Sequence, residues 1–189
     1  AKSGTVAAAA TVVRKKSGVE AVNQTQVDTS QYIYGNSSIL FDGSGDELQT
    51  KTKVDFSSAW CVEGWFRTGS TATQHLVVKS TSAENTEGGL GFNLRLASSK
   101  LQVYISGDGS NWNIASPMNG STSYSTNTWH HFALNWDGSN YRLWLDGNLE
   151  NTTASSTQVH QGSFDEFYIG AAEGSTADFN GHLSEIRFS

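Results

Sequence analysis

The chain of 189 residues contains one cysteine, one proline and one methionine. A single thiol, Cys61, excludes an internal disulfide, so the fold must be held by side-chain packing, with or without a metal ion. Charged residues make up 16% and hydrophobic residues 37% of the chain, both below the usual shares of a globular protein. Glycine, serine, threonine and asparagine take their place, which favours short strands and tight turns over helices.

Long hydrophobic runs are also missing. No apolar stretch approaches the roughly 20 residues of a membrane-spanning helix, so we expect no membrane partner. The stretch TVAAAATVV (5–13) is short and is followed by its basic cluster, whereas a secretory signal has the opposite order. The length suits one domain with a sizeable core.

The charge is unevenly distributed along the chain. The net charge is −6, but all charged side chains among the first 16 residues are basic, +4 in total, which leaves −10 for the rest. An acidic body argues against a nucleic-acid partner. We expect residues 1–27 to form an arm or linker whose basic residues contact an acidic partner in a larger assembly or another copy of the chain, or remain a solvated tail: Lys2, Arg14, Lys15 and Lys16.

Residues 28–189 follow a strand-and-turn pattern. Turn-forming segments such as DGSGD, WDGSN and LDGN separate the apolar runs, and Asp-Gly pairs between alternating runs indicate hairpins. The predicted strands are Gln31–Tyr34, Ser37–Phe41, Trp60–Arg67, Leu76–Lys79, Gly91–Leu96, Leu101–Ser106, Trp129–Trp136, Tyr141–Asp146, Phe164–Ile169 and Leu183–Phe188. This pattern predicts an all-β, two-sheet antiparallel jelly-roll sandwich.

Side chains alternate along the longest of these strands. One face of Trp129–Trp136 carries Phe132, Leu134 and Trp136, and the other carries His131, Ala133 and Asn135. The runs 60–67 and 141–146 alternate in the same way. Such strands fit a sandwich, because only one face of each sheet meets the core.

Eight segments in order carry a family resemblance: SILFDGSGDEL, WCVEGWFR, LVVKS, GFNLRL, LQVYIS, TWHHFALNWDGSNYRLWLDG, FYIG and FNGHLSEIRFS. Together they resemble the laminin G-like domains of the concanavalin A-like lectin/glucanase superfamily. This resemblance implies a jelly roll with one flat and one curved sheet. The first segment of the expected domain, DTSQYIYGNSSILFDGSGDEL (28–48), is also similar to modules of bacteriophage virion proteins and of secreted bacterial adhesion proteins.

The sequence lacks the catalytic signature of glucanases with this fold. Those enzymes use paired acids on one strand face, about 5–5.5 Å apart. The chain has no Glu-x-Asp, the neighbours Asp165 and Glu166 would point to opposite faces, and Glu63 stands alone on its strand face. His130 and His131 match the strand opening of the family and are expected to be structural. We therefore expect no enzymatic activity.

The loop Asp42-Gly-Ser44-Gly-Asp46 is a candidate metal site, because it spaces oxygen ligands as calcium loops do. The resemblance adds an acid of the last strand, here Glu185, although the family commonly has Asp-Glu where this chain has Ser184-Glu185. The alternative is a tight turn whose aspartates cap backbone amides. The only cofactor predicted is thus one structural Ca²⁺.

Two surfaces could bind a ligand. The mixed strand faces would form a polar and aromatic patch suited to sugars, if their strands are neighbours: Glu63, Trp65, Arg67, Asn135, Arg142 and Trp144. Alternatively, Trp65 and Trp144 belong to a second small core under long loops. Trp112 and Tyr124, in the Gly/Ser/Asn-rich segment 107–127, are further contact candidates.

These observations predict a non-catalytic surface module. Our first hypothesis is a virion surface protein, such as a capsid decoration or fibre protein, which is anchored by the arm and able to adhere to cell-surface glycans. The second is a free, calcium-dependent carbohydrate-binding lectin module of a secreted protein. Both place the chain on a virion surface or outside the cell.

Overall fold

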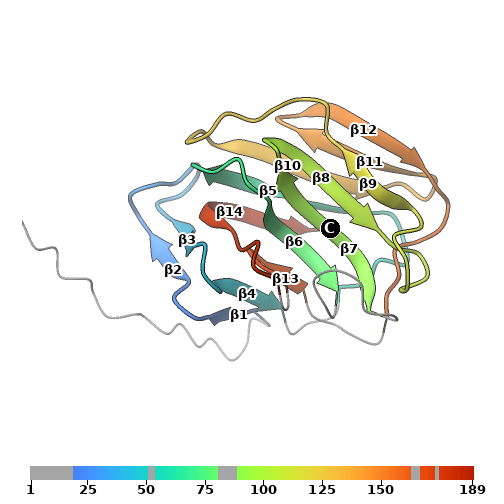
Figure 1. The fold of residues 1–189 in the computed structure, drawn as a ribbon, viewed down its shortest axis with the longest axis horizontal. Helices are drawn as coiled ribbons and strands as arrows, with labels where there is room; N and C mark the ends of the chain where they lie inside the picture. Colours follow the sequence, from blue (N-terminus) through green and yellow to red (C-terminus); the bar gives the residue numbers. More distant parts are fainter. Residues whose placement is uncertain (1–18, 51–53, 81–88, 163–166, 173–174) are drawn as a thin grey trace, which may run out of the picture.

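The computed structural model describes residues 19–50, 54–80, 89–162, 167–172 and 175–189 (Figure 1). In these ranges no helix is long and apolar enough to cross a membrane. The strands are β1 Val19–Val22, β2 Gln26–Asp28, β3 Ser38–Asp42, β4 Glu47–Thr50, β5 Trp60–Thr68, β6 Gln74–Ser80, β7 Leu90–Ala97, β8 Lys100–Ile105, β9 Ala115–Asn119, β10 His130–Trp136, β11 Asn140–Leu145, β12 Asn148–Ala154, β13 Phe167–Ile169 and β14 Asn180–Phe188.

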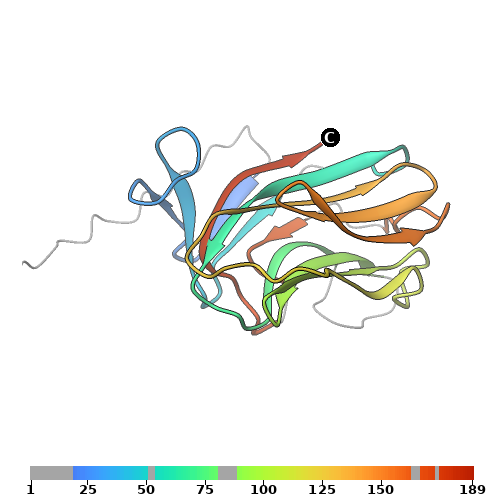
Figure 2. The same cartoon turned by 90° about the horizontal axis from the view of Figure 1, so that it is seen from above.

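The strands form two antiparallel sheets of seven, with the orders β1-β4-β13-β6-β7-β8-β9 and β12-β11-β10-β5-β14-β3-β2. The two sheets pack face to face, as the view from above shows (Figure 2). The predicted antiparallel sandwich is therefore confirmed.

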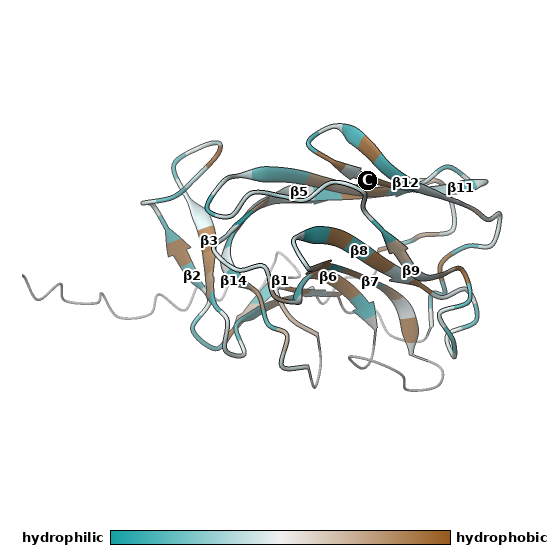
Figure 3. Ribbon diagram, turned by 45° about the horizontal axis from the view of Figure 1, so that its top comes forward, coloured by the Kyte–Doolittle hydropathy of each residue, from teal (hydrophilic) through white to brown (hydrophobic). Residues whose placement is uncertain are grey.

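The alternation of side chains places the core between the sheets. Along β5 every second residue is buried, beginning with Trp60 and ending with Thr68. Phe132, Leu134 and Trp136 of β10 are buried as predicted, and their neighbours on the same strand face outward. Hydrophobic and hydrophilic residues accordingly alternate along several strands (Figure 3). The core is rich in phenylalanine, which supplies large apolar area per residue.

The sandwich begins earlier than the predicted boundary between residues 27 and 28. β1 pairs with β4 at the edge of one sheet, and β2 pairs with β3 at the edge of the other. Both strands are too short to show a sequence period. The described residues 19–27, assigned to the arm from sequence, are therefore strands and the turn between them.

The turn between β1 and β2 crosses from one sheet to the other. The loop between β3 and β4 crosses beside it in the opposite direction. The Asp46 carboxylate joins the two crossings, because its Oδ1 accepts the N–H of Gln24 at 2.8 Å and its Oδ2 accepts the N–H of Asp42 at 3.0 Å. The Asn23 amide also donates to the carbonyl oxygen of Gly45. Asp46 is 1% exposed, so its carboxylate is a buried structural group.

Three strand predictions need correction or remain open. The segment 31–34 is irregular instead of a strand, and its two tyrosines are exposed. The segment 107–127, expected to be a loop, contains β9. β9 is an edge strand, which suits its Pro117 because proline has no N–H to donate to a neighbouring strand. The part of the predicted strand at 164–166 lies outside the described residues.

β14 contains a bulge that reverses which residues face the core. Ser184 pairs with Trp65, but the next regular pair is Arg187 with Glu63, so two residues are accommodated between them. Ile186 consequently packs on the core, where Gly64 leaves room because a Cβ there would lie 2.4 Å from Ile186 Cδ1. Arg187 faces outward on the same side as Glu63.

Candidate ligand-binding groove

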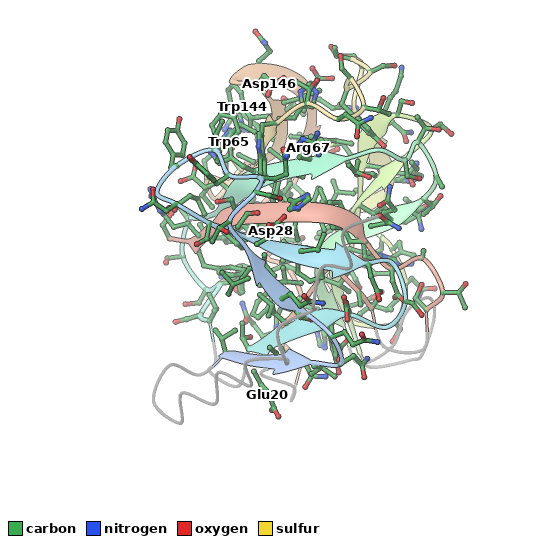
Figure 4. The ribbon with its side chains drawn as sticks, turned by 90° about the vertical axis from the view of Figure 1, so that its left-hand side faces the viewer. Glu20, Asp28, Trp65, Arg67, Trp144 and Asp146 are labelled. Atoms are coloured by element: carbon green, nitrogen blue, oxygen red, sulfur yellow. The ribbon has the colours of Figure 1, made fainter. Side chains whose placement is uncertain are left out.

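The outer face of the sheet at β14, β5, β10 and β11 carries the candidate site. The register places Trp65 beside His131 and Ser184, and Ala133 between Glu63 and Trp144. The strands predicted to carry the polar and aromatic patch are therefore direct neighbours. Figure 4 shows Trp65, Trp144 and Asp146 gathered at one end of the molecule.

A cavity of about 460 Å³ opens over β5, β10 and β14. Trp65 forms one wall, its ring lying 5.1 Å from His131 and 5.7 Å from Tyr34 between centroids. Tyr34 comes from the loop before β3 and meets Trp65 edge-on. The described residues that line it are Tyr34, Glu63, Trp65, His131, Asp146, Gly147, Glu185 and Arg187.

A second cavity of about 560 Å³ continues along the sheet over β10 and β11. Its lining includes Trp144, Asn135, Ala133 and Cys61, and it shares His131 and Gly147 with the first cavity. The two cavities therefore form one elongated groove, which we call the β5–β10 groove. Trp65 stands in one half and Trp144 in the other.

Polar contacts fix the side chains that line the groove. Glu63 is contacted on both oxygens, by Arg187 Nη1 at 3.4 Å and by His131 Nε2 at 3.5 Å. Trp144 Nε1–H donates to Asn135 Oδ1 at 2.7 Å, which orients the indole ring. These contacts hold aromatic faces beside hydrogen-bonding groups, the combination that recognises sugars.

The turn after β11 forms the end of the first cavity. The Asp146 carboxylate accepts a hydrogen bond from His130 Nδ1 at 2.7 Å and another from the backbone N–H of His131 at 2.8 Å. Asp146 adopts a φ of 50°, in the left-handed region that aspartate tolerates better than most residues. The expectation that His130 is structural fits its contacts, whereas His131 lines the groove.

Cys61 lies in the second cavity, opposite Asn135 on the neighbouring strand. Burial raises the pKa of its thiol to about 11, with a further contribution from the charge of Glu63. The thiol is therefore protonated at neutral pH and acts as a small apolar surface rather than as a nucleophile.

Two residues of the predicted patch lie outside the groove lining. Arg142 Nη1 donates to Asp137 Oδ2 at 2.5 Å, which helps to hold the pKa of Asp137 at about 2. Arg142 thus secures the WDGSN turn. Arg67 lies opposite His182, whose ring contacts Asp28 at 2.7 Å, and neither cavity includes Arg67.

The other two predicted contact residues lie away from the groove. Tyr124 is 4% exposed and donates its hydroxyl hydrogen to the Ser70 carbonyl, so it is corrected from a surface contact to a core residue. Burial raises its pKa to about 12. Trp112 packs against Tyr104 of β8, in the opposite sheet, with the two rings tilted and 5.6 Å apart between centroids.

The four predicted calcium ligands do not come together. Asp42 lies opposite Asn180 on β14, and Glu185 lies five residues further along that strand, roughly 16 Å away. Asp42 Oδ1 accepts the N–H of Ser44, and Asp46 caps two other amides. No group of three or more His, Cys, Asp or Glu in the described ranges is placed to hold a metal. These contacts do not test calcium binding at the loop alone, but because both Asp46 oxygens already accept backbone N–H groups we expect none there.

Several predicted residues lie outside the described part of the chain. These are the basic residues of the arm and the acidic pair of residues 165 and 166: Lys2, Arg14, Lys15, Lys16, Asp165 and Glu166. Their roles stay predictions.

The groove also contains residues that the sequence did not mark as ligand contacts, namely Tyr34, His131, Asp146 and Arg187. His131 shares the outward face with Asn135 and could have been included from that alternation. Tyr34 comes from an irregular loop, and Arg187 faces outward only because of the bulge.

The comparisons place the chain in a family. The profile of the Concanavalin A-like lectin/glucanases superfamily matches residues 42–189. The chain therefore belongs to this superfamily, which confirms the resemblance. Comparison with curated protein sequences gives no match.

Solved structures with the same fold include domains LG4-5 of the mouse laminin alpha1 chain, with 18% identity and a TM-score of 0.61, covering 84% of this chain and 42% of that one. Domain 4 of AbnA, a GH43 extracellular arabinanase from Geobacillus stearothermophilus in complex with arabinotriose, has 14% identity and a TM-score of 0.64, covering 88% and 75%.

A third similar structure is the binding domain of botulinum neurotoxin DC in complex with SialylT, with 13% identity and a TM-score of 0.63, covering 90% of this chain and 42% of that one. The chain thus spans about two fifths of the laminin and neurotoxin structures. At these identities the comparisons establish the fold alone.

Proposed function

We propose that this chain is a non-catalytic recognition module that binds carbohydrate in the β5–β10 groove. The observation that carries the proposal is the groove itself, in which Trp65 and Trp144 stand in adjoining cavities lined by hydrogen-bonding side chains. Sugars pack their apolar faces on aromatic rings and bond their hydroxyls to carboxylate and amide groups. Two relatives with this fold, the arabinanase domain and the neurotoxin domain, are described in complex with arabinotriose and SialylT.

The side chains around Glu63 support binding without catalysis. The same-face neighbours of Glu63 on β5 are Cys61 and Trp65, so this strand does not provide the second carboxylate that a glucanase needs on one strand face. Glu63 is also engaged by Arg187 and His131. We expect no release of reducing sugar when the protein is incubated with β-glucans.

Tryptophan substitutions test the groove. A glycan array should first identify a binding sugar, and isothermal titration should then measure its affinity for Trp65→Ala and Trp144→Ala. Loss of one stacking ring is expected to weaken binding by about 1–3 kcal/mol, by analogy with aromatic stacking of other rings, while the protein stays folded.

Trp112→Ala is the matched control because Trp112 packs against Tyr104 in the opposite sheet, away from the groove. Binding that depends on Trp112 and not on Trp65 or Trp144 would move the site to the 107–127 segment. An array without any bound glycan would refute carbohydrate binding.

The setting of this module is proposed to be a surface assembly, with a virion surface (capsid decoration or fibre) as the first choice and a secreted lectin as the alternative. Support comes from the +4 charge of residues 1–16 against −10 for the rest. Deletion of residues 1–18 tests the anchor and leaves β1 and β2 intact. We expect the deletion variant to lose its incorporation into the larger assembly, or to lose a homo-oligomer that light scattering detects in the full chain. An assembly that the deletion leaves unchanged would count against an anchor in residues 1–18.

A further inference from the structure

The Trp65 half of the groove has an excess of negative charge. Of the eight described residues that line it, three are carboxylates and one is a guanidinium, which gives a net charge of −2 with a neutral histidine: Glu63, Asp146, Glu185 and Arg187. The whole chain has a net charge of −6, so its long-range field also repels anions. An anionic ligand therefore meets repulsion both at a distance and in the groove.

The basic side chains described in this half, Arg187 and His131, already have a carboxylate partner. Arg187 and His131 both contact Glu63, on its two separate oxygens. Arg67, which could have neutralised a ligand carboxylate, lies outside both cavity linings. An acidic sugar would have to compete with Glu63 for Arg187.

The three carboxylates of this half differ in how many protein groups they contact. Asp146 is bonded to His130 and to the His131 backbone, and Glu63 faces its two basic partners. Among the described residues Glu185 has no hydrogen bond or ion pair, and it is exposed. Of the three carboxylates described in this half, that of Glu185 is thus the one without a protein partner and available to a ligand.

The backbone explains why Glu185 reaches the groove. It occupies the bulge of β14 and has a φ of 54°, a left-handed conformation uncommon for glutamate. Bulges re-aim side chains and recur beside functional sites. In a regular strand, alternation after Ser184 would have turned residue 185 toward the core.

We propose that the groove selects neutral and amino sugars over uronic and sialic acids, and that Glu185 is the specificity-determining residue. This inference rests on carbohydrate binding in the β5–β10 groove. Glu185 accepts hydrogen bonds from ring hydroxyls or pairs with a protonated amine, and its charge repels a sugar carboxylate. Trp65 provides the neighbouring stacking surface for the sugar ring.

The experiment is a glycan array of matched pairs, each neutral or amino glycan beside its sialylated or uronate counterpart, followed by titration of the best pair. The acidic member is expected to bind at least about fivefold more weakly, as one close charge repulsion in a hydrated site predicts. Glu185→Gln should reduce this difference about fivefold. Glu20→Gln, which removes a charge from β1 at the far end of the molecule, should leave it unchanged (Figure 4).

The outcomes separate the two proposals. Stronger binding of the acidic members overturns the charge selection but leaves carbohydrate binding in place. A preference that Glu185→Gln does not alter overturns the role of Glu185. Absence of binding to every glycan refutes the proposed function, and the selection with it. The wild-type comparison decides the selection even if the variant fails to fold, which thermal melting would reveal.

Discussion

Replacing Gly170 by alanine is expected to destabilise the sandwich strongly, because two separate penalties fall on one residue. Gly170 has a φ of 87°, and an added Cβ would lie 2.4 Å from Cε1 of Phe41, which is wholly buried. Its backbone cannot easily retreat, since Gly170 N–H donates to Leu76 and its carbonyl accepts from Phe179. Left-handed strain costs about 1–2 kcal/mol and overpacking about 1–3 kcal/mol, so the sum is about 2–5 kcal/mol.

Gly138→Ala separates the two penalties. Gly138 has a similar φ of 93°, but no heavy atom of the described residues lies within 4 Å of its Cβ position. Both substitutions change the unfolded chain alike, so the difference between them measures the clash alone. At roughly 2–4 °C per kcal/mol for a chain of this length, Gly170→Ala should melt about 2–12 °C below Gly138→Ala.

Thermal unfolding followed by circular dichroism measures this difference, and urea unfolding gives it as a free energy. Equal melting temperatures would show that Phe41 moves aside at no cost. This part of the core would then not be rigidly packed.

Three further predictions concern other groups. Cys61 should react with iodoacetamide at pH 8 about 100-fold more slowly than glutathione, since its raised pKa leaves little thiolate; equal rates would contradict the buried setting. Asp28→Asn should lower the free energy of unfolding at pH 7. Because the backbone N–H of Ser30, and then His182, hold the pKa of Asp28 below its ordinary value of 3.8, its contribution is present above that value and disappears as the pH falls further. If urea unfolding shows that the loss of stability in Asp28→Asn persists unchanged at pH 2, this explanation is wrong. Calcium added to chelator-treated protein should release no heat and leave the melting temperature unchanged, because the Asp46 oxygens already accept backbone N–H groups. A saturable heat that is lost in Asp42→Asn would instead establish a loop site.

The fold was largely predictable because its information is local. In β5, β10 and β11 the alternation of apolar and polar residues assigns each side chain to a face without knowledge of the partner strand. β1, β2 and β4 have three or four residues each, which is too short for a period to emerge. Their pairing depends on tertiary contacts such as those of Asp46.

The groove was predictable only in part. Glu63, Trp65, Asn135 and Trp144 were found because strand alternation places them on one face, and the structure brings them into adjoining cavities. Arg142 shares that face, but its long side chain turns to a nearby aspartate. The alternation of residues along a strand predicts the face on which a side chain lies. It does not predict how far that side chain extends or which nearby charge it pairs with.

The groove residues supplied by β14 were hidden by the bulge. A regular alternation from Ser184 would have placed Ile186 and Phe188 outward and Arg187 in the core. The structure does the opposite, and Phe188 lies 5.0 Å from Phe167 between ring centroids. One inserted residue thus determines which charges reach the groove.

The N-terminal crossing between the sheets sets the order in which contacts break when the domain is pulled from its N-terminal end. A pulling force applied through the chain before Val19 acts first on the four pairs between β1 and β4. Once these separate, the load reaches Gln24, whose N–H is held by the buried carboxylate of Asp46, and only then β2. Tension at this end would therefore first separate β1 from β4 and then break the hydrogen bond between Gln24 and Asp46. The β5–β10 groove, on strands further into the sheet, would keep its shape meanwhile.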